Sequence, residues 1–183
     1  IFPSLLFALI SRYIHPIVFK NLIEGIIRMA IFILYIYIIS RMKDIKRVFQ
    51  YHGAEHKSIF CYENLEELTV ENARKYTTLH PRCGTNFLFI VMLVSIFVYS
   101  FLGWQRILIR ILLRIVMLPV VAGISYEMLR FLGRSKSKFV HTLAYPGLLL
   151  QKLTTAEPDD GMLEVAIAAL NAVLEDTKGE DVQ

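Results

Sequence analysis

Residues 22–40 read LIEGIIRMAIFILYIYIIS, and this stretch sets the class of the protein. It is apolar apart from Glu24, Arg28 and the terminal serine. A run of about 20 such residues matches the roughly 30 Å hydrocarbon core of a bilayer, so the stretch predicts a transmembrane helix. The basic segment RMKDIKR follows it, which is typical of a cytoplasmic exit.

The composition of the whole chain supports this interpretation. Of its 183 residues 55% are hydrophobic, and they concentrate in runs at 1–39, 86–104 and 107–132. A soluble domain contains about 45–50% apolar residues. The formal net charge is +4, but the basic residues flank the apolar runs and form no separate patch. We therefore expect a lipid bilayer as partner and no nucleic acid.

The expected fold is all-α, with about four membrane segments, a helical cytoplasmic loop and a C-terminal amphipathic helix. The membrane segments are the end of a span at 1–14, residues 22–40, residues 86–103 and about 112–132. We expect two domains. Residues 1–138 form a transmembrane domain that includes a cytoplasmic His/Cys loop at 43–85, and residues 139–183 hold the remaining segments.

Shorter elements follow from local signals. The loop predicts helices at 44–62 and 69–77, with Thr69 as N-cap of the second. Residues 139–153 are too short to span and are interrupted by Pro146 and Gly147, which predicts a re-entrant or interfacial segment. Pro158 and the pair Asp159 and Asp160 mark the start of the final helix. Its apolar stripe consists of Leu163, Ala166, Ile167, Leu170 and Leu174.

Arg106, Arg110 and Arg114 share one helical face. They predict a helix start in the membrane interface, with the side chains reaching lipid headgroups.

The stretch YHGAEHKSIF, at 51–60, carries the clearest chemical pattern. His52 and His56 lie one helical turn apart, so both imidazoles can reach one metal ion, and Glu55 lies near the same face. The order H-x-x-E-H is that of the inverted zincins. Zn²⁺ lowers the pKa of its bound water towards about 7, and Glu55 could accept that proton.

A second cluster, HPRCG at 80–84, adds His80 and Cys83, which are typical zinc donors. If both bind with His52 and His56, the site is closed and structural; if one binds, it is open and fit for catalysis. The alternative is that these residues contact headgroups or cap helices. Cys61 lies beyond His56 and is interpreted as a bystander.

Charges within the apolar runs are costly and usually face a partner or a cavity. Glu24 and Arg28 could satisfy one another, or line a transport pathway together with Glu127. Glu127 could instead reach the membrane interface or support the metal site. Thr154, Thr155 and Glu157, in QKLTTAEPDD, either fold back on that site or cap the final helix.

Three motifs in order carry a resemblance: FQYHGAEHKSI, HPRCGTNF and LQKLTTAEPDDGMLEVAIAAL. From about Leu22 to Leu170 the chain resembles the bacterial YqhQ-like membrane proteins, a family with a domain of unknown function that is often labelled a metal-dependent enzyme. The resemblance implies a site of His52, Glu55, His56, His80, Arg82 and Cys83. It also implies a glycine-rich N-terminal stretch that is not found here. Because the chain begins at Ile1 without methionine, we expect a missing N-terminal part.

The leading hypothesis is a multi-pass metalloprotein of the bacterial cell membrane, with a hydrolytic zinc site at the cytoplasmic surface. Glu55 would act as base, and Arg82 would stabilise developing negative charge. A lipid-linked molecule or membrane peptide would be the substrate. The alternatives are a transporter or channel using Glu24, Arg28 and Glu127, and a non-catalytic assembly factor with a structural zinc site. The chain could also form a homo-oligomer.

Overall fold

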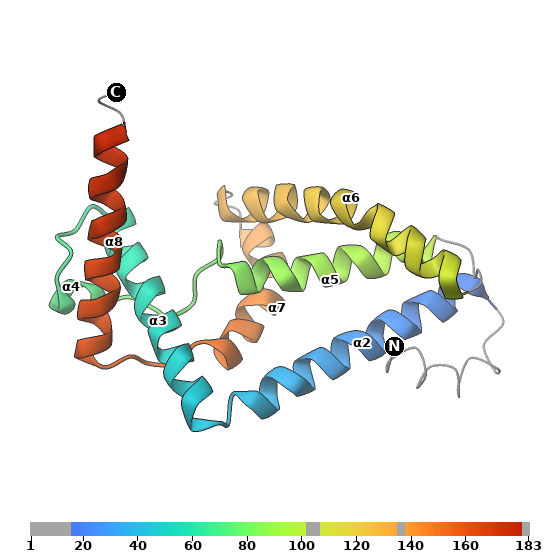
Figure 1. The fold of residues 1–183 in the computed structure, drawn as a ribbon, viewed down its shortest axis with the longest axis horizontal. Coiled ribbons are helices and arrows are strands. Elements are labelled where there is room, and N and C mark those ends of the chain that lie inside the picture. The colour runs from blue at the N-terminus through green and yellow to red at the C-terminus, as the bar shows by residue number, and fades with distance from the viewer. Residues whose placement is uncertain (1–15, 102–106, 135–137, 181–183) are drawn as a thin grey trace. The chain divides into compact units, whose positions relative to one another are not determined.

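The structure is a computed structural model that describes residues 16–101, 107–134 and 138–180. Within these ranges it contains seven helices and no strand (Figure 1). The all-α prediction is therefore confirmed, whereas the expected segment at 1–14 lies outside the described residues. The helices are α2 (Ile17–Ile39), α3 (Lys43–Glu63), α4 (Val70–Arg74), α5 (Gly84–Ser100), α6 (Ile107–Arg134), α7 (Lys138–Thr154) and α8 (Asp160–Glu180).

The chain divides into two compact units. Residues 1–36 and 81–150 form one, which we call the apolar unit, and residues 37–80 and 151–183 form the other, which we call the polar unit. Each unit is thus assembled from two separate stretches of chain. The histidine cluster predicted from the sequence falls in the polar unit, and the charged residues of the apolar runs fall in the apolar unit.

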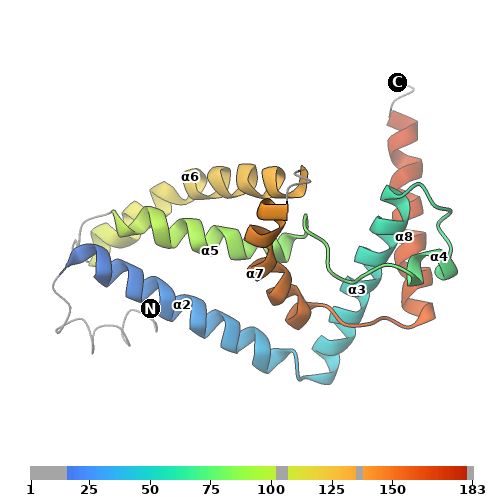
Figure 2. The ribbon, with the colours of Figure 1, turned by 180° about the vertical axis from the view of Figure 1, so that it is seen from behind.

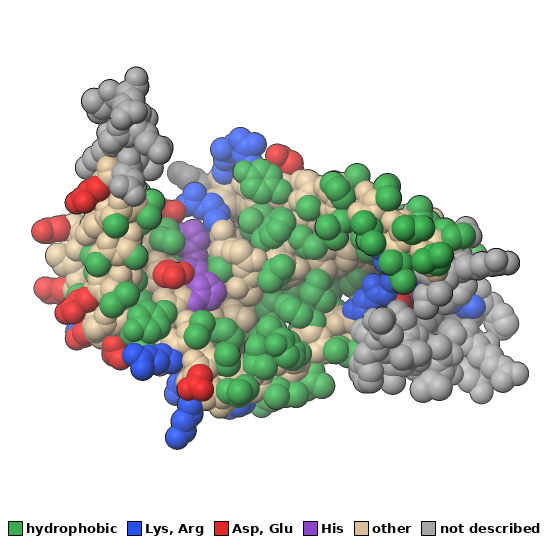
Figure 3. All heavy atoms as spheres, viewed as in Figure 1, with side chains coloured by type: hydrophobic (Ala, Val, Ile, Leu, Met, Phe, Trp, Pro, Cys, Tyr) green, Lys and Arg blue, Asp and Glu red, His purple; other side chains and the backbone are tan. Residues whose placement is uncertain are grey.

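Two helices of the apolar unit are long and apolar enough to cross a membrane. They are Ile17–Ile39, with 23 residues, and Leu108–Arg134, with 27. In each helix only 11% of the most apolar window is buried, so these helices do not resemble the core helices of a soluble domain. Figure 3 shows hydrophobic side chains covering the surface over α5 and α6. About four spans were expected; two helices within the described residues meet the length criterion, and α5 is shorter, with 17 residues.

The helices of the apolar unit pack through small and branched side chains. Ile90 and Val94 of α5 are buried against Val121 and Leu132 of α6. Gly25 brings α2 close to α5, because a Cβ there would lie 2.5 Å from Cγ1 of Ile96. The antiparallel pair α5–α6 is visible in both ribbon views (Figures 1 and 2).

Helix α7 corrects one prediction. It runs without interruption through Pro146, so the expected break at the Pro-Gly pair is wrong. The glycine serves packing instead: a Cβ on Gly147 would lie 1.7 Å from Oδ1 of Asn86, which is itself buried and donates from Nδ2 to the Pro81 carbonyl at 2.7 Å. Gly147 therefore allows α7 to contact the first turn of α5.

The polar unit is built from α3, α4 and α8, which pack side by side (Figure 2). Its core contains small and aliphatic side chains from all three helices. They are Ala54, Cys61, Ala73, Met162, Leu163, Ala166 and Ile167. Three of the five residues in the predicted apolar stripe of the last helix are thus buried here, and Leu170 and Leu174 are partly buried.

Helix starts in the polar unit follow the predicted signals. The Thr69 hydroxyl accepts a hydrogen bond from the Asn72 amide at 3.3 Å, and the Asp159 carboxylate accepts one from the Met162 amide at 2.9 Å. Each side chain satisfies a backbone donor that the first helical turn leaves unpaired. Helix α4 ends at Arg74, whereas the sequence predicted a helix that continues to residue 77.

Candidate metal centre

Two histidines on α3 lie together as the sequence predicts. The rings of His52 and His56 have centroids 4.4 Å apart at an interplanar angle of 66°. One ring nitrogen of each lies within 4.8 Å of the other. His56 is buried and His52 is partly buried, so the pair sits at the edge of the polar unit and is not freely solvated.

Both imidazoles are held by backbone carbonyls. Nδ1 of His52 lies 2.8 Å from the Thr154 carbonyl oxygen, and Nδ1 of His56 lies 2.5 Å from that of Thr78. A carbonyl oxygen can only accept, so each Nδ1 donates a proton and each Nε2 of a neutral ring keeps its lone pair. Histidines that bind metals usually have this arrangement, because the second hydrogen bond fixes both tautomer and ring orientation.

The carbonyl above His52 is placed by close backbone packing. The Ala156 amide donates to the Phe49 carbonyl at 2.9 Å. A Cβ on Gly53 would lie 2.2 Å from the Ala156 carbonyl oxygen, so only glycine at this position allows the segment to approach α3. The glycine inside YHGAEH thus contributes to the orientation of His52.

His80 is the third predicted histidine brought into this cluster. Its ring centroid lies 5.7 Å from that of His56, and its Nε2 lies 3.5 Å from Oε2 of Glu63. The fully buried side chain of Gln151 holds the His80 backbone, accepting from its N–H at 2.8 Å and donating to its C=O at 2.7 Å. Gln151 was missed from sequence, because a glutamine in LLLQKL carries no signal of its partner.

Three further residues were predicted to take part in the metal site: Glu55, Cys83 and Arg82. Glu55 is exposed on α3. Cys83 belongs to the apolar unit, where its Sγ accepts a hydrogen bond from the Thr85 amide at 3.3 Å and caps α5. Arg82 is exposed in the same unit, and its side chain packs over α6, where a Cβ on Gly133 would lie 2.5 Å from the Arg82 Cγ.

The residues expected to support the site have distinct positions. Thr154 contributes its carbonyl to His52. Glu157 forms an ion pair with the buried Lys57 at 2.5 Å, and Lys57 also donates to the Arg74 carbonyl at 3.1 Å. Glu127 is exposed on α6 and lies 3.7 Å from Arg130. The segment at 154–157 therefore folds against α3.

Cys61 has a structural setting. Its side chain is fully buried in the polar core, and its Sγ donates to the Glu67 carbonyl at 3.3 Å. Burial, followed by the nearby charge of Glu66, raises the pKa of the Cys61 thiol. A protonated, buried thiol is inert, which agrees with its interpretation as a bystander.

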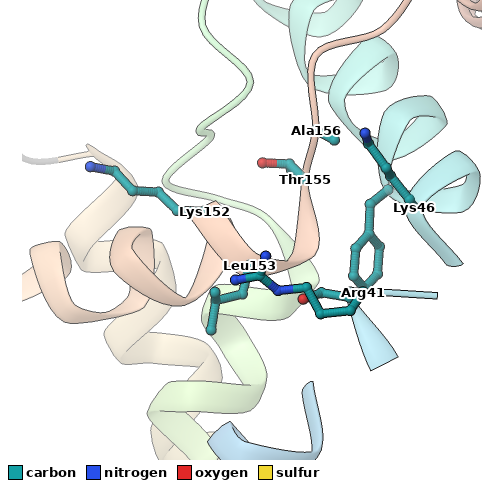
Figure 4. Close-up of a pocket in the computed structure, with 8 residues that line it drawn as sticks. Arg41, Lys46, Lys152, Leu153, Thr155 and Ala156 are labelled. Carbon is teal, nitrogen blue, oxygen red and sulfur yellow. The ribbon is translucent and has the colours of Figure 1, made fainter. Parts of the chain in front are cut away.

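A cationic pocket of about 390 Å³ lies on the polar unit (Figure 4). Arg41, Lys46 and Lys152 line it, together with the hydroxyl-bearing Ser40 and Thr155. Thr155 directly follows the residue whose carbonyl holds His52, so one short segment contributes to both the pocket and the histidine pair.

Charged residues in the apolar unit form a separate cluster. The Glu24 side chain is 1% exposed and forms the predicted ion pair with Arg28. Arg114 lies 3.2 Å and Arg110 lies 3.8 Å from the same carboxylate. These two arginines were expected to reach lipid headgroups. They lie inside α6 and contact Glu24 instead, while Arg106 falls outside the described residues.

The fold and the site define an all-helical protein with membrane-length helices and a partly buried histidine cluster. Residues 1–176 match the family model described as "Protein of unknown function (DUF1385)", and the chain belongs to this family. It is 43% identical over 153 residues to "Uncharacterized protein YqhQ" of Bacillus subtilis (strain 168), which covers 83% of this chain and 48% of the relative. The chain thus spans about half the length of that curated relative. No solved structure matches it.

The resemblance to the YqhQ-like proteins noted from the motifs is therefore confirmed. Neither the family description nor the relative's name specifies an activity, so the enzymatic label attached to the resemblance gains no support from them.

Proposed function

We propose that this chain forms the metal-binding part of a multi-pass membrane hydrolase. One observation carries the proposal: the Nδ1 atoms of His52 and His56 both donate to backbone carbonyls, which leaves an Nε2 lone pair on each of two rings whose centroids lie 4.4 Å apart. Chance pairs of surface histidines have no reason to share such a fixed tautomer. Neutral imidazoles held in this way suit Zn²⁺ or a similar transition metal.

Cys83 is the third ligand that we propose. It follows His80 by three residues, so the chain between them spans at most about 10 Å. The ring of His80 lies 5.7 Å from that of His56, so a donor three residues further along the chain is consistent with the pattern of the histidines. Two imidazoles and a thiolate leave one coordination position open, as catalytic zinc sites require. His80, whose Nε2 faces Glu63, would then orient its neighbours without binding the metal.

The chemistry would use residues around this set. A bound zinc ion would supply Lewis acidity and favour deprotonation of water. Glu55 is exposed beside His56, so its carboxylate is free of the core to accept a proton. Arg82 would stabilise developing negative charge. The three basic residues of the nearby pocket favour an anionic substrate, such as a phosphate-linked lipid, over a neutral membrane peptide.

The multi-pass arrangement is also a proposal. The contacts of Glu24 with Arg110 and Arg114 bring the N-terminal halves of α2 and α6 together, so these helices would cross in the same direction. Helix α5, about 26 Å long, would return between them. Basic residues at 41–47 and 130–138 would face the cytoplasm of a bacterial cell. The basic residues Arg110 and Arg114 at the other end of α6 do not oppose this orientation, because they contact Glu24.

The decisive test is metal content of detergent-purified protein, measured by mass spectrometry for wild type and for His52→Ala, His56→Ala and Cys83→Ala. We expect close to one metal ion per wild-type chain and loss in all three variants. Cys61→Ala is the matched control, since it removes the other thiol and should retain the metal. Circular dichroism verifies that each variant stays folded. A metal-free wild type, purified without chelator, would refute the proposal.

A structural zinc site is the second candidate, because the two histidines already join segments 102 and 22 positions away in the chain. A metal there would hold the loop and tail together without catalysis, as an assembly factor requires. His80→Gln separates the two readings. Retained metal supports the open, three-ligand site, whereas lost metal in a folded variant supports a closed, four-ligand site.

Catalysis itself is tested with a chromogenic phosphodiester in detergent. Glu55→Gln should retain the metal and lower turnover by about 100-fold. If Glu55→Gln is as active as wild type, Glu55 is not the base. If wild type shows no turnover of phosphodiester, phosphomonoester or peptide probes while its metal is present, the structural candidate is preferred.

A further inference from the structure

The buried charges of the apolar unit do not balance. One carboxylate, that of Glu24, faces the guanidinium groups of Arg28, Arg110 and Arg114. The side chains of Arg110 and Arg114 are only 13% and 22% exposed. Because uncompensated charge among apolar helices is costly, a cluster with this excess of positive charge favours a further anion.

The unit's own sequence supplies no second carboxylate close to Glu24. Within residues 1–36 and 81–150 the acidic residues are Glu24 and Glu127. Glu127 follows Arg114 by 13 positions on the same helix, which places it about 20 Å further along. It pairs with Arg130 at 3.7 Å instead. The unit thus carries more positive than negative charge around Glu24, which favours a bound anion.

The space beside the cluster has an amphipathic lining. A pocket of about 70 Å³ and a larger one of about 410 Å³ share Arg28, Ser95, Tyr99 and Arg114. From these polar groups the larger pocket continues along α6 over Ile115, Leu118 and Val121. A groove with a cationic end and an aliphatic end matches a molecule that has a negative head and a hydrocarbon chain.

Contacts with neighbouring groups hold the arginines at the cationic end of the groove in place. The Arg114 guanidinium lies 5.5 Å from the centre of the Tyr99 ring, and the Tyr99 hydroxyl donates to the Arg114 carbonyl at 3.3 Å. Gly25 lets α2 approach α5 at this level, which holds Arg28 of α2 close to Ser95 of α5. Guanidinium groups with fixed positions bind phosphate oxygens through paired hydrogen bonds.

We propose that this groove binds one anionic phospholipid. Its phosphate diester would contact Arg28 and Arg114, and an acyl chain would lie along Ile115, Leu118 and Val121. The inference does not depend on a metal in the polar unit, because it uses residues of the apolar unit only.

Native mass spectrometry of delipidated protein in detergent tests the proposal. Phosphatidylglycerol is compared with phosphatidylcholine that carries the same acyl chains. We expect phosphatidylglycerol to bind at least about tenfold more tightly. Arg114→Gln should remove most of this preference, and Arg114→Lys should remove part of it while keeping the charge. Arg130→Gln, on the same helix outside the groove, is the matched control and should preserve it.

Glu24→Gln provides a second, independent readout. If the arginines form an anion site, removal of the competing carboxylate should tighten phosphatidylglycerol binding. A folded Glu24→Gln variant that loses binding would show that the cluster is structural and would overturn the proposal. Equal affinity of wild type for the two lipids, or an equal loss in Arg130→Gln, would also overturn it. If millimolar inorganic phosphate displaces the lipid, the groove is a site for small anions and the phospholipid proposal is overturned.

Discussion

The histidine cluster of the polar unit and the arginine cluster of the apolar unit satisfy their polar groups in opposite ways. His52 and His56 are held by neutral backbone carbonyls, which fixes the rings without adding charge. Glu24 is held by three cationic side chains, and the result is a surplus of positive charge. The first arrangement leaves lone pairs that suit a cation. The second concentrates positive charge, which suits an anion.

The difference teaches that burial alone does not specify what a polar cluster binds. His56 and Glu24 are both almost completely buried. The two side chains differ in the kind of partner. A backbone carbonyl accepts a hydrogen bond from the ring and adds no net charge, whereas a guanidinium group adds a full positive charge. Each arrangement can be tested by comparing a substitution within the cluster with a similar substitution at an exposed or loosely packed position.

The largest effect is expected for Glu24→Ala. Removing the carboxylate leaves three partly buried guanidinium groups without it, which should lower the free energy of unfolding by about 3 kcal/mol. Glu127→Ala, which removes an exposed carboxylate from α6, should change it by less than about 1 kcal/mol. Denaturation in detergent, followed by circular dichroism, measures both. Equal effects of the two substitutions would contradict the charge balance described for the apolar unit.

Gly53→Ala should perturb the histidine cluster. Its Cβ would lie 2.2 Å from the Ala156 carbonyl oxygen, so the segment that holds His52 must move. We expect a loss of about 2 kcal/mol in the free energy of unfolding, together with reduced metal content. Gly123→Ala is the control, since nothing lies within 4 Å of its Cβ and alanine favours the helix by up to about 1 kcal/mol. A neutral Gly53→Ala would show that the close approach is not needed.

Arg74→Ala sets the scale for an exposed ion pair. Arg74 contacts Asp160 in the polar unit, with side chains 58% and 61% exposed. Solvent screening should limit the loss in unfolding free energy to less than about 1 kcal/mol, well below that of Glu24→Ala. Thermal unfolding at low and high salt measures it, and high salt should reduce the difference further. A loss as large as that of Glu24→Ala would show that exposure does not separate the two pairs.

The smallest effect concerns Tyr76. A hydrogen bond from its hydroxyl to Glu66, at 2.8 Å, is the main cause that raises the pKa of Tyr76 to about 12, above the usual value of 10. Because the folded pKa is raised, this contribution to stability is complete below pH 10 and disappears as the pH rises towards 12. Tyr76→Phe should lack this part of the pH dependence. Ultraviolet titration of tyrosinate detects the missing late step; identical titrations would contradict the assignment.

Features with a helical period or a local signal could be predicted. The apolar run at 22–40 indicated α2, and the spacing of His52 and His56 placed both on one turn of α3. Thr69 and Asp159 marked helix starts because a cap is satisfied within three residues. The prediction of a helix break at Pro146 and Gly147 was wrong. The cost of a proline is offset here because the following glycine allows tight packing against Asn86.

The sequence by itself determined an all-helical chain, its membrane-length helices and the paired histidines, since these depend on residues within a few turns of one another. Only the tertiary structure decided that the carbonyls of Thr154 and Thr78 orient those histidines, that Gln151 holds His80, and that α6 turns two arginines towards Glu24. The partners of these groups lie 102, 22, 71 and 90 positions away along the chain. No local pattern encodes such contacts, because they arise from the packing of distant helices.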